Sequence, residues 1–191
     1  MKNNITYGEL PLENIKEYEN ISMNYTTNKK YQIKKINNGL GGIIFELVDV
    51  PEFFKDFGVK VEHWKEIFDL TNWKFFVAYN AKNELVAGCV VATKTANCRM
   101  LEGRDDIAVL WDIRVSNEYK RQGIGQKLFN MAIKWAKDSG FKTFKVECQN
   151  TNTSAVKFYH KQGMELCAIN EFAYPDYPNE AQLLWYLNLK D

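Results

Sequence analysis

Residues 107–136 constrain the fold more than any other stretch of the chain. Ile107 to Val115 is rich in β-branched and apolar residues and leads into a polar, glycine-containing loop that ends at Gly125. From Ile124 to Trp135, apolar side chains recur every three or four residues, which is the spacing of one face of a helix. The sequence therefore predicts a buried strand, a loop and an amphipathic helix in succession.

The loop has the composition of an anion-binding site. The run Lys120-Arg121-Gln122-Gly123-Ile124-Gly125 lies where the helix begins. Amide N–H groups are unpaired in the first turn of a helix, and the positive end of the helix dipole lies there, so a phosphate group binds well. The two glycines let a pyrophosphate approach the amides, and Lys120 and Arg121 add positive charge. Taken alone, the run is equally consistent with a flexible loop, because the P-loop and dinucleotide spacings are absent.

Bulk composition narrows the class of protein. The chain has 191 residues and a formal net charge of +1, which suits one α/β domain. The small net charge argues against a nucleic-acid partner and against an anionic membrane surface. The first residues lack the apolar region of a signal peptide, so we expect a cytoplasmic protein. Its cysteines show no C-x-x-C spacing, and we expect reduced thiols and no metal site.

The rest of the chain reads as alternating strands and helices. We expect residues 1–30 to form a peripheral arm, with a short helix after Pro11, and residues 31–191 to form a single domain. Further strands are predicted at residues 31–36, 43–50, 73–79, 84–95, 141–148, 164–173 and 181–189. Further helices are predicted at residues 51–58, beginning at Pro51, at 61–70 and at 154–162.

Two motifs resemble the GNAT N-acetyltransferase superfamily. The strand, the run from Lys120 to Gly125 and the helix resemble its acetyl-CoA-binding motif R/Q-x-x-G-x-G/A, with Lys120 in a position that usually holds Gln or Arg. The later run Asn152-x-x-Ala155-x-x-Phe158-Tyr159-x-Lys161-x-Gly163 resembles the family's late helix motif. The resemblance implies an α/β (α+β) fold of the GNAT type. In that fold a mixed central sheet of about seven strands has helices on both faces, and its strands splay apart at the acetyl-CoA site.

The resemblance also implies how acetyl-CoA binds. The pyrophosphate would sit on the backbone amides of residues 121–126, and the pantetheine arm would pair with Ile113 and Val115 like an added strand. Asn152 would bond the pantetheine arm, and Lys161 would lie near the nucleotide. The implied acetyl-CoA residues are Ile113, Arg114, Val115, Lys120, Arg121, Gln122, Gly123, Ile124, Gly125, Gln126, Asn152, Ala155, Tyr159 and Lys161.

Acylation of an amine needs a neutral nucleophile, stabilisation of an oxyanion and a proton for the leaving thiolate. The resemblance assigns the acid to Tyr159, whose ordinary pKa of ~10 keeps it protonated, and the oxyanion to the backbone N–H near Ile113. Glu147 and Asp112 are candidate bases, and Glu147 ranks first. The structural alternatives are a packed helix tyrosine, a surface ion pair of Glu147 with Lys145 or another lysine, and a buried hydrogen-bonded carboxylate at Asp112.

Four stretches resemble streptothricin acetyltransferases, which acetylate the β-lysine amine of an antibiotic: residues 45–57, 112–115, 147–152 and 174–186. The resemblance implies a small-molecule primary amine as substrate and an antibiotic-resistance role. The candidate amine-binding residues are Tyr174, Tyr177 and Glu180, and their alternative is an ordinary turn.

The alternative substrates are a protein N-terminus, a lysine or a polyamine. A non-catalytic acyl-CoA sensor is the alternative of another class. The sequence is consistent with a monomer and with a homodimer.

Overall fold

The computed structural model describes residues 4–58 and 60–190. The described strands form a seven-stranded sheet in the order β1-β4-β5-β6-β7-β9-β8 and a two-stranded sheet, β2-β3. The chain divides into two compact units. Unit 1 comprises residues 1–23, 57–146 and 187–191, and unit 2 comprises residues 24–56 and 147–186.

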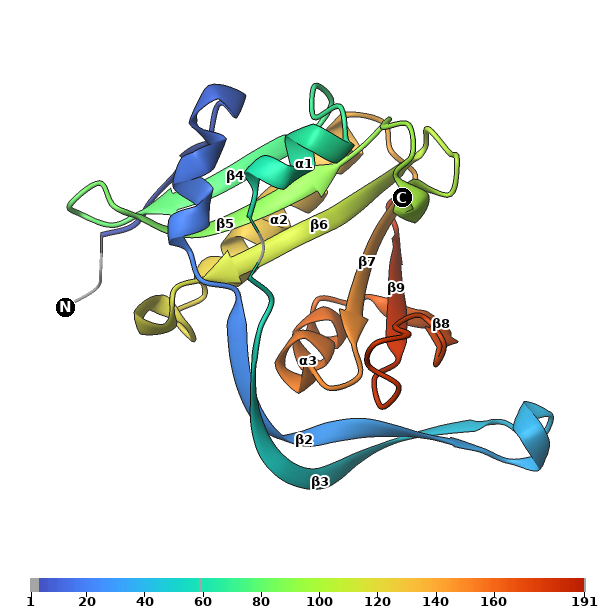
Figure 1. The fold of residues 1–191 in the computed structure, drawn as a ribbon. Coiled ribbons are helices and arrows are strands. Elements are labelled where there is room, and N and C mark those ends of the chain that lie inside the picture. Colours follow the sequence, from blue (N-terminus) through green and yellow to red (C-terminus); the bar gives the residue numbers. More distant parts are fainter. Residues whose placement is uncertain (1–3, 59, 191) are drawn as a thin grey trace. The chain divides into compact units, whose positions relative to one another are not determined.

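Unit 1 contains an antiparallel sheet with one parallel neighbour (Figure 1). Neighbouring strands pair antiparallel from β1 to β6, and β6 pairs parallel with β7, from Ile107↔Thr143 to Leu110↔Val146. Two parallel neighbours need a crossover connection, which α2 provides. The strands and the helix are β1 (Thr6–Glu9), β4 (Lys74–Tyr79), β5 (Leu85–Ala92), β6 (Ile107–Val115), β7 (Thr143–Gln149) and α2 (Ile124–Asp138).

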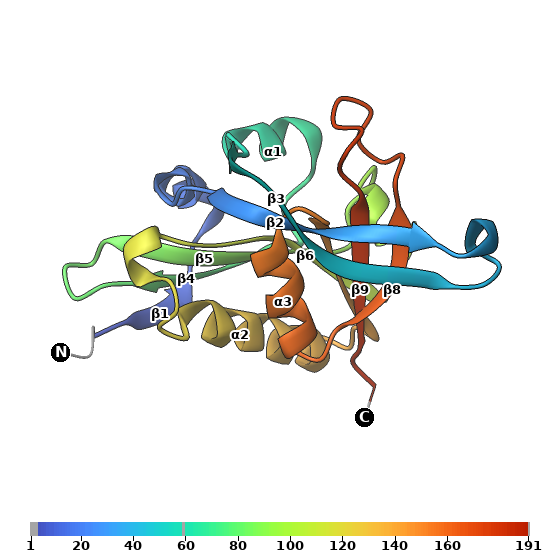
Figure 2. The same ribbon diagram turned by 90° about the horizontal axis from the view of Figure 1, so that it is seen from below.

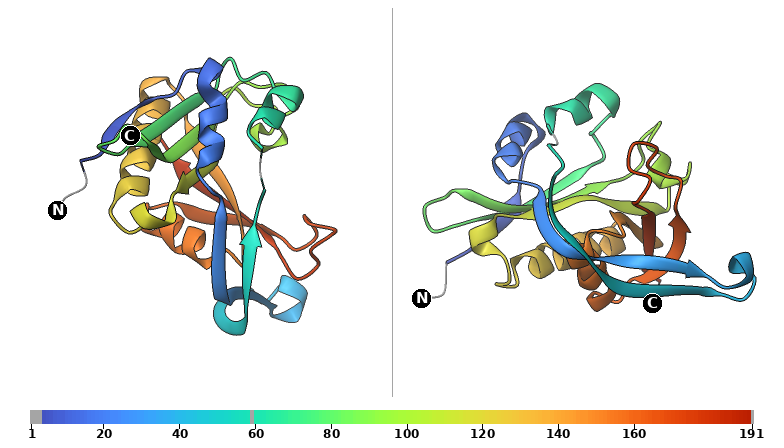
Figure 3. Two further views of the ribbon diagram at one scale, coloured as in Figure 1. Left: turned by 60° about the vertical axis from the view of Figure 1, so that its left-hand side comes forward. Right: turned by 60° about the horizontal axis from the view of Figure 1, so that its bottom comes forward.

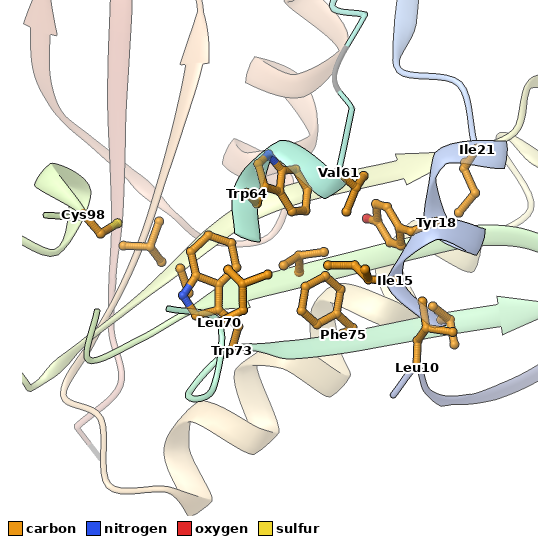
Figure 4. Packing of buried hydrophobic residues seen from close by; sticks show 14 of the residues in the cluster. Leu10, Ile15, Tyr18, Ile21, Val61, Trp64, Leu70, Trp73, Phe75 and Cys98 are labelled. Atoms are coloured by element: carbon orange, nitrogen blue, oxygen red, sulfur yellow. The ribbon is translucent and has the colours of Figure 1, made fainter. Parts of the chain in front are cut away.

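Helices cover both faces of the unit 1 sheet. Figure 2 shows α2 along one face, while the 3-10 helix η1 (Leu12–Asn20) and the helix α1 (Glu62–Ile67) lie over the other. Between η1, α1 and the sheet lies the main core cluster, in which Tyr18 is surrounded by apolar side chains from all three (Figure 4). The expected mixed sheet of seven strands with helices on both faces is confirmed.

The N-terminal residues pack into this core instead of forming a peripheral arm. Strand β1 pairs with β4, and the side chains of Ile15, Tyr18 and Ile21 are at most 1% exposed. These residues recur every third position, which is the period of a 3-10 helix and gives one continuous apolar face.

Unit 2 begins with a long hairpin, β2 (Asn24–Lys35) and β3 (Ile43–Asp56), whose tip holds the short helix η2 (Asn37–Gly39) (Figure 3). The helix predicted at Pro51 is wrong, because β3 continues to Asp56. The partners on β3 jump from Phe53 to Asp49 where the register shifts, so Pro51 lies at an irregularity in the ladder. A residue without an N–H is tolerated there.

The remainder of unit 2 follows the prediction more closely. It contains α3 (Thr153–Lys161) and the antiparallel pair β8 (Glu165–Asn170) and β9 (Gln182–Asn188). In unit 1, α1 is shorter than predicted and Ile67 is 61% exposed, because the chain is already extended at Phe68. Among the described residues, no helix is both long and apolar enough to cross a bilayer.

Candidate functional site

The loop between β6 and α2 leaves the start of the helix open. Arg121 and the N-cap residue Gly123 both have positive φ, 61° and 82°. Within the described chain, no side chain caps the first turn of α2, and that turn contains no acidic residue. Its amide groups and the positive end of the dipole are therefore available to an anion.

The glycines keep side chains away from this turn. A Cβ at Gly123 would meet nothing within 4 Å, and one at Gly125 would lie 3.5 Å from Val115 Cγ2. Val115 therefore faces α2. The side chain of Lys120 is exposed, yet partial desolvation of its ammonium group lowers its pKa. The loop thus has space and positive charge for a phosphate group.

Strand β6 carries a bulge next to the loop. Val90 pairs with Asp112, and Val91 pairs with Leu110, so Trp111 is an extra residue on β6. Trp111 packs against the core cluster on the face of η1 and α1, at ring distances of 5.1 Å from Trp73 and 5.2 Å from Phe68.

The side chains of Asp112 and Arg114 form a buried ion pair, in which they are 1% and 3% exposed. The Arg114 guanidinium donates to both oxygens of Asp112, at 2.9 and 2.5 Å, and to the Ile21 carbonyl at 2.9 Å. Tyr18 donates a further bond to Asp112 at 2.8 Å. Burial and the Asp112 charge raise the pKa of Tyr18 well above its ordinary value, so Tyr18 remains a donor. These interactions hold η1 against β6.

In unit 2, Asn152 is the N-cap of α3, and its side chain accepts a hydrogen bond of 3.1 Å from the Ala155 amide. Tyr159 is 5% exposed, and its ring lies 5.6 Å from the ring of Phe158. Lys161 is exposed at the end of the helix. The late motif therefore forms a capped helix with its tyrosine buried.

Glu147 and Tyr174 form a hydrogen-bonded pair in unit 2, in which the Tyr174 hydroxyl donates to Glu147. The pKa of Glu147 is raised, chiefly because its side chain is buried. The hydrogen bond from Tyr174 and the charge of Lys55 act in the opposite direction, and the charge of Glu180 adds to the rise. Burial and Glu147 raise the pKa of Tyr174 in turn. A carboxylate with a raised pKa is a plausible proton acceptor.

Lys55 joins this pair to the other predicted amine-binding residues. Its ammonium group forms an ion pair with Glu180 and lies 4.4 Å from the centre of the Tyr177 ring. The structure thus gathers Glu147, Tyr174, Tyr177 and Glu180 in unit 2. Sequence reasoning missed Lys55, because the predicted helix at Pro51 hid its place on a strand.

The sequence comparison with protein families decides the assignment. Residues 45–164 match the Acetyltransferase (GNAT) family. The chain belongs to the GNAT acetyltransferase family. The matched range contains both motifs in full, the run from Lys120 to Gly125 and the late helix motif from Asn152 to Gly163.

Two curated relatives of this GNAT chain are named streptothricin acetyltransferases. It is 36% identical over 81 residues to streptothricin acetyltransferase A of Bacillus subtilis (strain 168), which covers 41% of this chain and 47% of the relative. It is 32% identical over 85 residues to a streptothricin acetyltransferase of Escherichia coli, which covers 43% and 49%. The matches span about half the length of these curated relatives.

The fold is shared with solved structures. A protein from Bacillus anthracis str. Ames, crystallised in complex with acetyl coenzyme A, superposes with a TM-score of 0.75 at 23% sequence identity. The match covers 97% of this GNAT chain and 99% of that protein.

The cysteines of this GNAT chain do not form an evident nucleophile. Cys89, Cys98 and Cys148 are buried thiols and Cys167 is an exposed one. Burial raises the pKa of each of the three buried thiols, which disfavours the reactive thiolate. Within residues 4–58 and 60–190, no group of acidic, histidine and cysteine side chains could hold a metal ion.

Proposed function

We propose that this chain transfers an acetyl group from acetyl-CoA to a primary amine of a small molecule of the streptothricin type, by direct attack in a ternary complex. The observation that carries the proposal is the open first turn of α2, without a side-chain cap or an acidic residue in the described chain, in a member of the GNAT family. The B. anthracis relative binds acetyl coenzyme A.

The residues of the loop suit the diphosphate of acetyl-CoA. The amides of residues 121–126 would bind it, with Lys120 nearby as a positive charge. The bulge at Trp111 increases the local twist of β6. The backbone of Ile113 and Val115 beyond that bulge would pair with the pantetheine arm. Acetyl-CoA would supply the activated thioester.

The proposed transfer uses one base and one acid. Glu147 would take the proton from the ammonium or the attacking amine, directly or through water. The amine nitrogen would then bond the carbonyl carbon, and the carbonyl electron pair would move to oxygen, where the N–H near Ile113 would stabilise the oxyanion. When that pair returns, the carbon–sulfur bond would break, and Tyr159 would protonate the leaving sulfur.

Glu147 is a better proposed base than Asp112. Asp112 is already bonded by Arg114 and Tyr18 in a pair almost completely withdrawn from solvent. Proton uptake there would leave the Arg114 guanidinium buried without its counter-charge, which is costly. We therefore assign Arg114 a role in acetyl-CoA binding through its backbone alone.

The acceptor side of the proposal rests on unit 2 and on the named relatives. A carboxylate at Glu180 and the aromatic ring of Tyr177 form a surrounding that favours an ammonium group, and Tyr174 holds the proposed base. Two of the relatives are named for streptothricin, whose acceptor would be an amine of this kind.

Detection of free thiol from acetyl-CoA tests the proposal. Streptothricin, a polyamine, an aminoglycoside and a peptide with a free N-terminus are offered in turn. We expect thiol release with streptothricin. If thiol is released only with the peptide, the acceptor is a protein N-terminus and not a small-molecule amine.

The change Tyr159→Phe separates an enzyme from a sensor. We expect acetyl-CoA to bind as before while kcat falls by about a hundredfold, the size of a general-acid contribution. Tyr31→Phe, which keeps a ring stacked on Phe45 at 4.5 Å, is the control. If the wild-type chain binds acetyl-CoA but releases no thiol with any amine, the protein is a non-catalytic acyl-CoA sensor.

A further inference from the structure

The ion pair between Lys55 and Glu180 differs from its neighbours on the hairpin. Their side chains are 16% and 11% exposed, whereas those of Lys29 and Asp49 on the same sheet are 43% and 81% exposed. The Lys55 ammonium also lies over the Tyr177 ring. Lys55 is therefore held in a secluded place by two groups that both favour a cation.

A carboxylate beside an aromatic face would hold any alkylammonium group, because the charge and the ring quadrupole both attract it. The end of a lysine side chain has the shape of a primary alkylamine. Tyr177 is 56% exposed, so the place occupied by the Lys55 ammonium borders on solvent. A soluble amine can reach it from that side.

We propose that Lys55 occupies the subsite for a second ammonium group of the acceptor, and that the acceptor displaces it. The inference rests on the proposed acetyltransferase function and narrows its substrate to molecules with two amino groups. One amine binds between Glu180 and Tyr177, and the other is the amine that Glu147 deprotonates. Lys55 is a specificity-determining residue and takes no part in the chemistry.

The exchange of one ammonium group for another keeps the charge of the cluster unchanged. The charged groups that face one another here are Glu147, Glu180 and Lys55, so loss of the lysine without replacement would leave two carboxylates together. The flexible stem of a lysine lets its ammonium move into water while the stem stays packed. An acceptor with one amine cannot fill the subsite and reach the base together.

Calorimetric titration with 1,5-diaminopentane in the absence of acetyl-CoA tests the inference. Lys55→Met keeps an apolar stem of nearly the same length and removes the charge, so binding should tighten by about tenfold, which corresponds to about 1.4 kcal/mol for the competing ammonium. Lys29→Met, on the exposed pair of the same hairpin, should bind as the wild type does. Equal or weaker binding by Lys55→Met would overturn the inference.

Two further variants sharpen the test, and Lys55→Gln replaces Lys55→Met if that variant does not fold, as judged by its thermal transition. Glu180→Gln in the wild-type chain removes the partner of Lys55 and of the diamine alike, so binding of 1,5-diaminopentane should change by less than about threefold. In the chain that lacks the Lys55 ammonium, Glu180→Gln removes the partner of the diamine alone and should weaken binding by about tenfold. Unchanged binding by Glu180→Gln in that chain would refute the subsite.

Turnover gives an independent reading. With 1,5-diaminopentane as acceptor, Lys55→Met should lower KM and leave kcat within about twofold, the pattern of altered ground-state binding. A fall in kcat would place Lys55 in the chemistry and contradict the inference. Because the titration needs no acetyl-CoA, a chain that binds the diamine but releases no thiol with streptothricin or any other amine would refute the proposed function and leave the subsite standing.

Discussion

Tyr18 and Asp112 lie 94 residues apart in the chain and share a buried hydrogen bond of 2.8 Å. The guanidinium of Arg114 lies 4.8 Å from the centre of the Tyr18 ring. A carboxylate on the strand that leads to the loop at Gly123 is therefore satisfied by the N-terminal helix and by Arg114. We propose that Asp112 stabilises the fold and that another group transfers the proton.

Removal of Asp112 should destabilise the fold strongly. Asp112→Ala leaves the Arg114 guanidinium buried without its partner, and we expect a loss of about 3–5 kcal/mol in the free energy of unfolding. Tyr18→Phe removes one hydrogen bond and should cost about 1–2 kcal/mol. Urea unfolding measures both. Lys134→Ala, which breaks an ion pair with side chains 78% and 61% exposed, should change stability by less than about 0.5 kcal/mol.

Gly88 on β5 is needed because the Tyr18 ring lies against it. A Cβ at this position would overlap the ring, so Gly88→Ala should displace η1 and lower the free energy of unfolding by about 1–3 kcal/mol. Gly8→Ala on β1 is the control, since a Cβ there would meet nothing within 4 Å. Equal unfolding midpoints for the two variants would contradict this packing.

Two glycines of similar conformation separate strain from anion binding. Gly123 precedes α2 and Gly140 follows it, with φ of 82° and 81°, and a Cβ at either would meet nothing within 4 Å. Alanine at either position should cost about 1 kcal/mol of stability. Only Gly123→Ala should weaken acetyl-CoA binding, measured by calorimetry. An equal effect of both variants on that binding would remove the diphosphate from this loop.

The pH dependence of kcat/KM should report the ionisation of Glu147. The base must be ionised, and its pKa is raised by burial, so activity should fall as the pH drops through a value above the ordinary glutamate pKa of ~4.3. Tyr174→Phe removes a bond that favours the carboxylate, and the acidic limb should move to higher pH. Tyr31→Phe should leave it in place. No shift in Tyr174→Phe would point to another base.

The sequence predicted the elements with a strong local signal. The strand at residues 107–115 is predicted by its β-branched and apolar composition, and the helix that follows is predicted by the helical spacing of its apolar residues. The α3 motif begins with an asparagine, Asn152, which is a typical N-cap residue. The N-terminal helix was harder to place, because its apolar residues follow a period of three. The continuation of β3 through Pro51 was missed, since a proline before aromatic residues also fits the start of a helix.

The candidate site was less accessible to sequence reasoning. Asp112 and Arg114 are polar residues on a buried strand, and sequence alone does not distinguish a catalytic carboxylate from an internal ion pair. Their bond partner Tyr18 comes from a distant segment whose packing no local pattern encodes. Lys55 was missed because a helix was predicted where β3 continues, and because its partner Glu180 lies 125 residues further along the chain.

The extra residue at Trp111 divides β6 into two parts that present different positions to η1. Up to Leu110 the strand pairs with β5 on one side and with β7 on the other. Before the insertion Ile107 and Val109 face the core cluster of η1 and α1, and Trp111 packs against the same cluster. After it, Asp112 and Arg114 face η1 and Val115 faces α2. Because side chains alternate along a strand, the one-residue insertion reverses the face of every residue that follows it. Without the extra residue, Asp112 and Arg114 would face α2 and would not meet Tyr18.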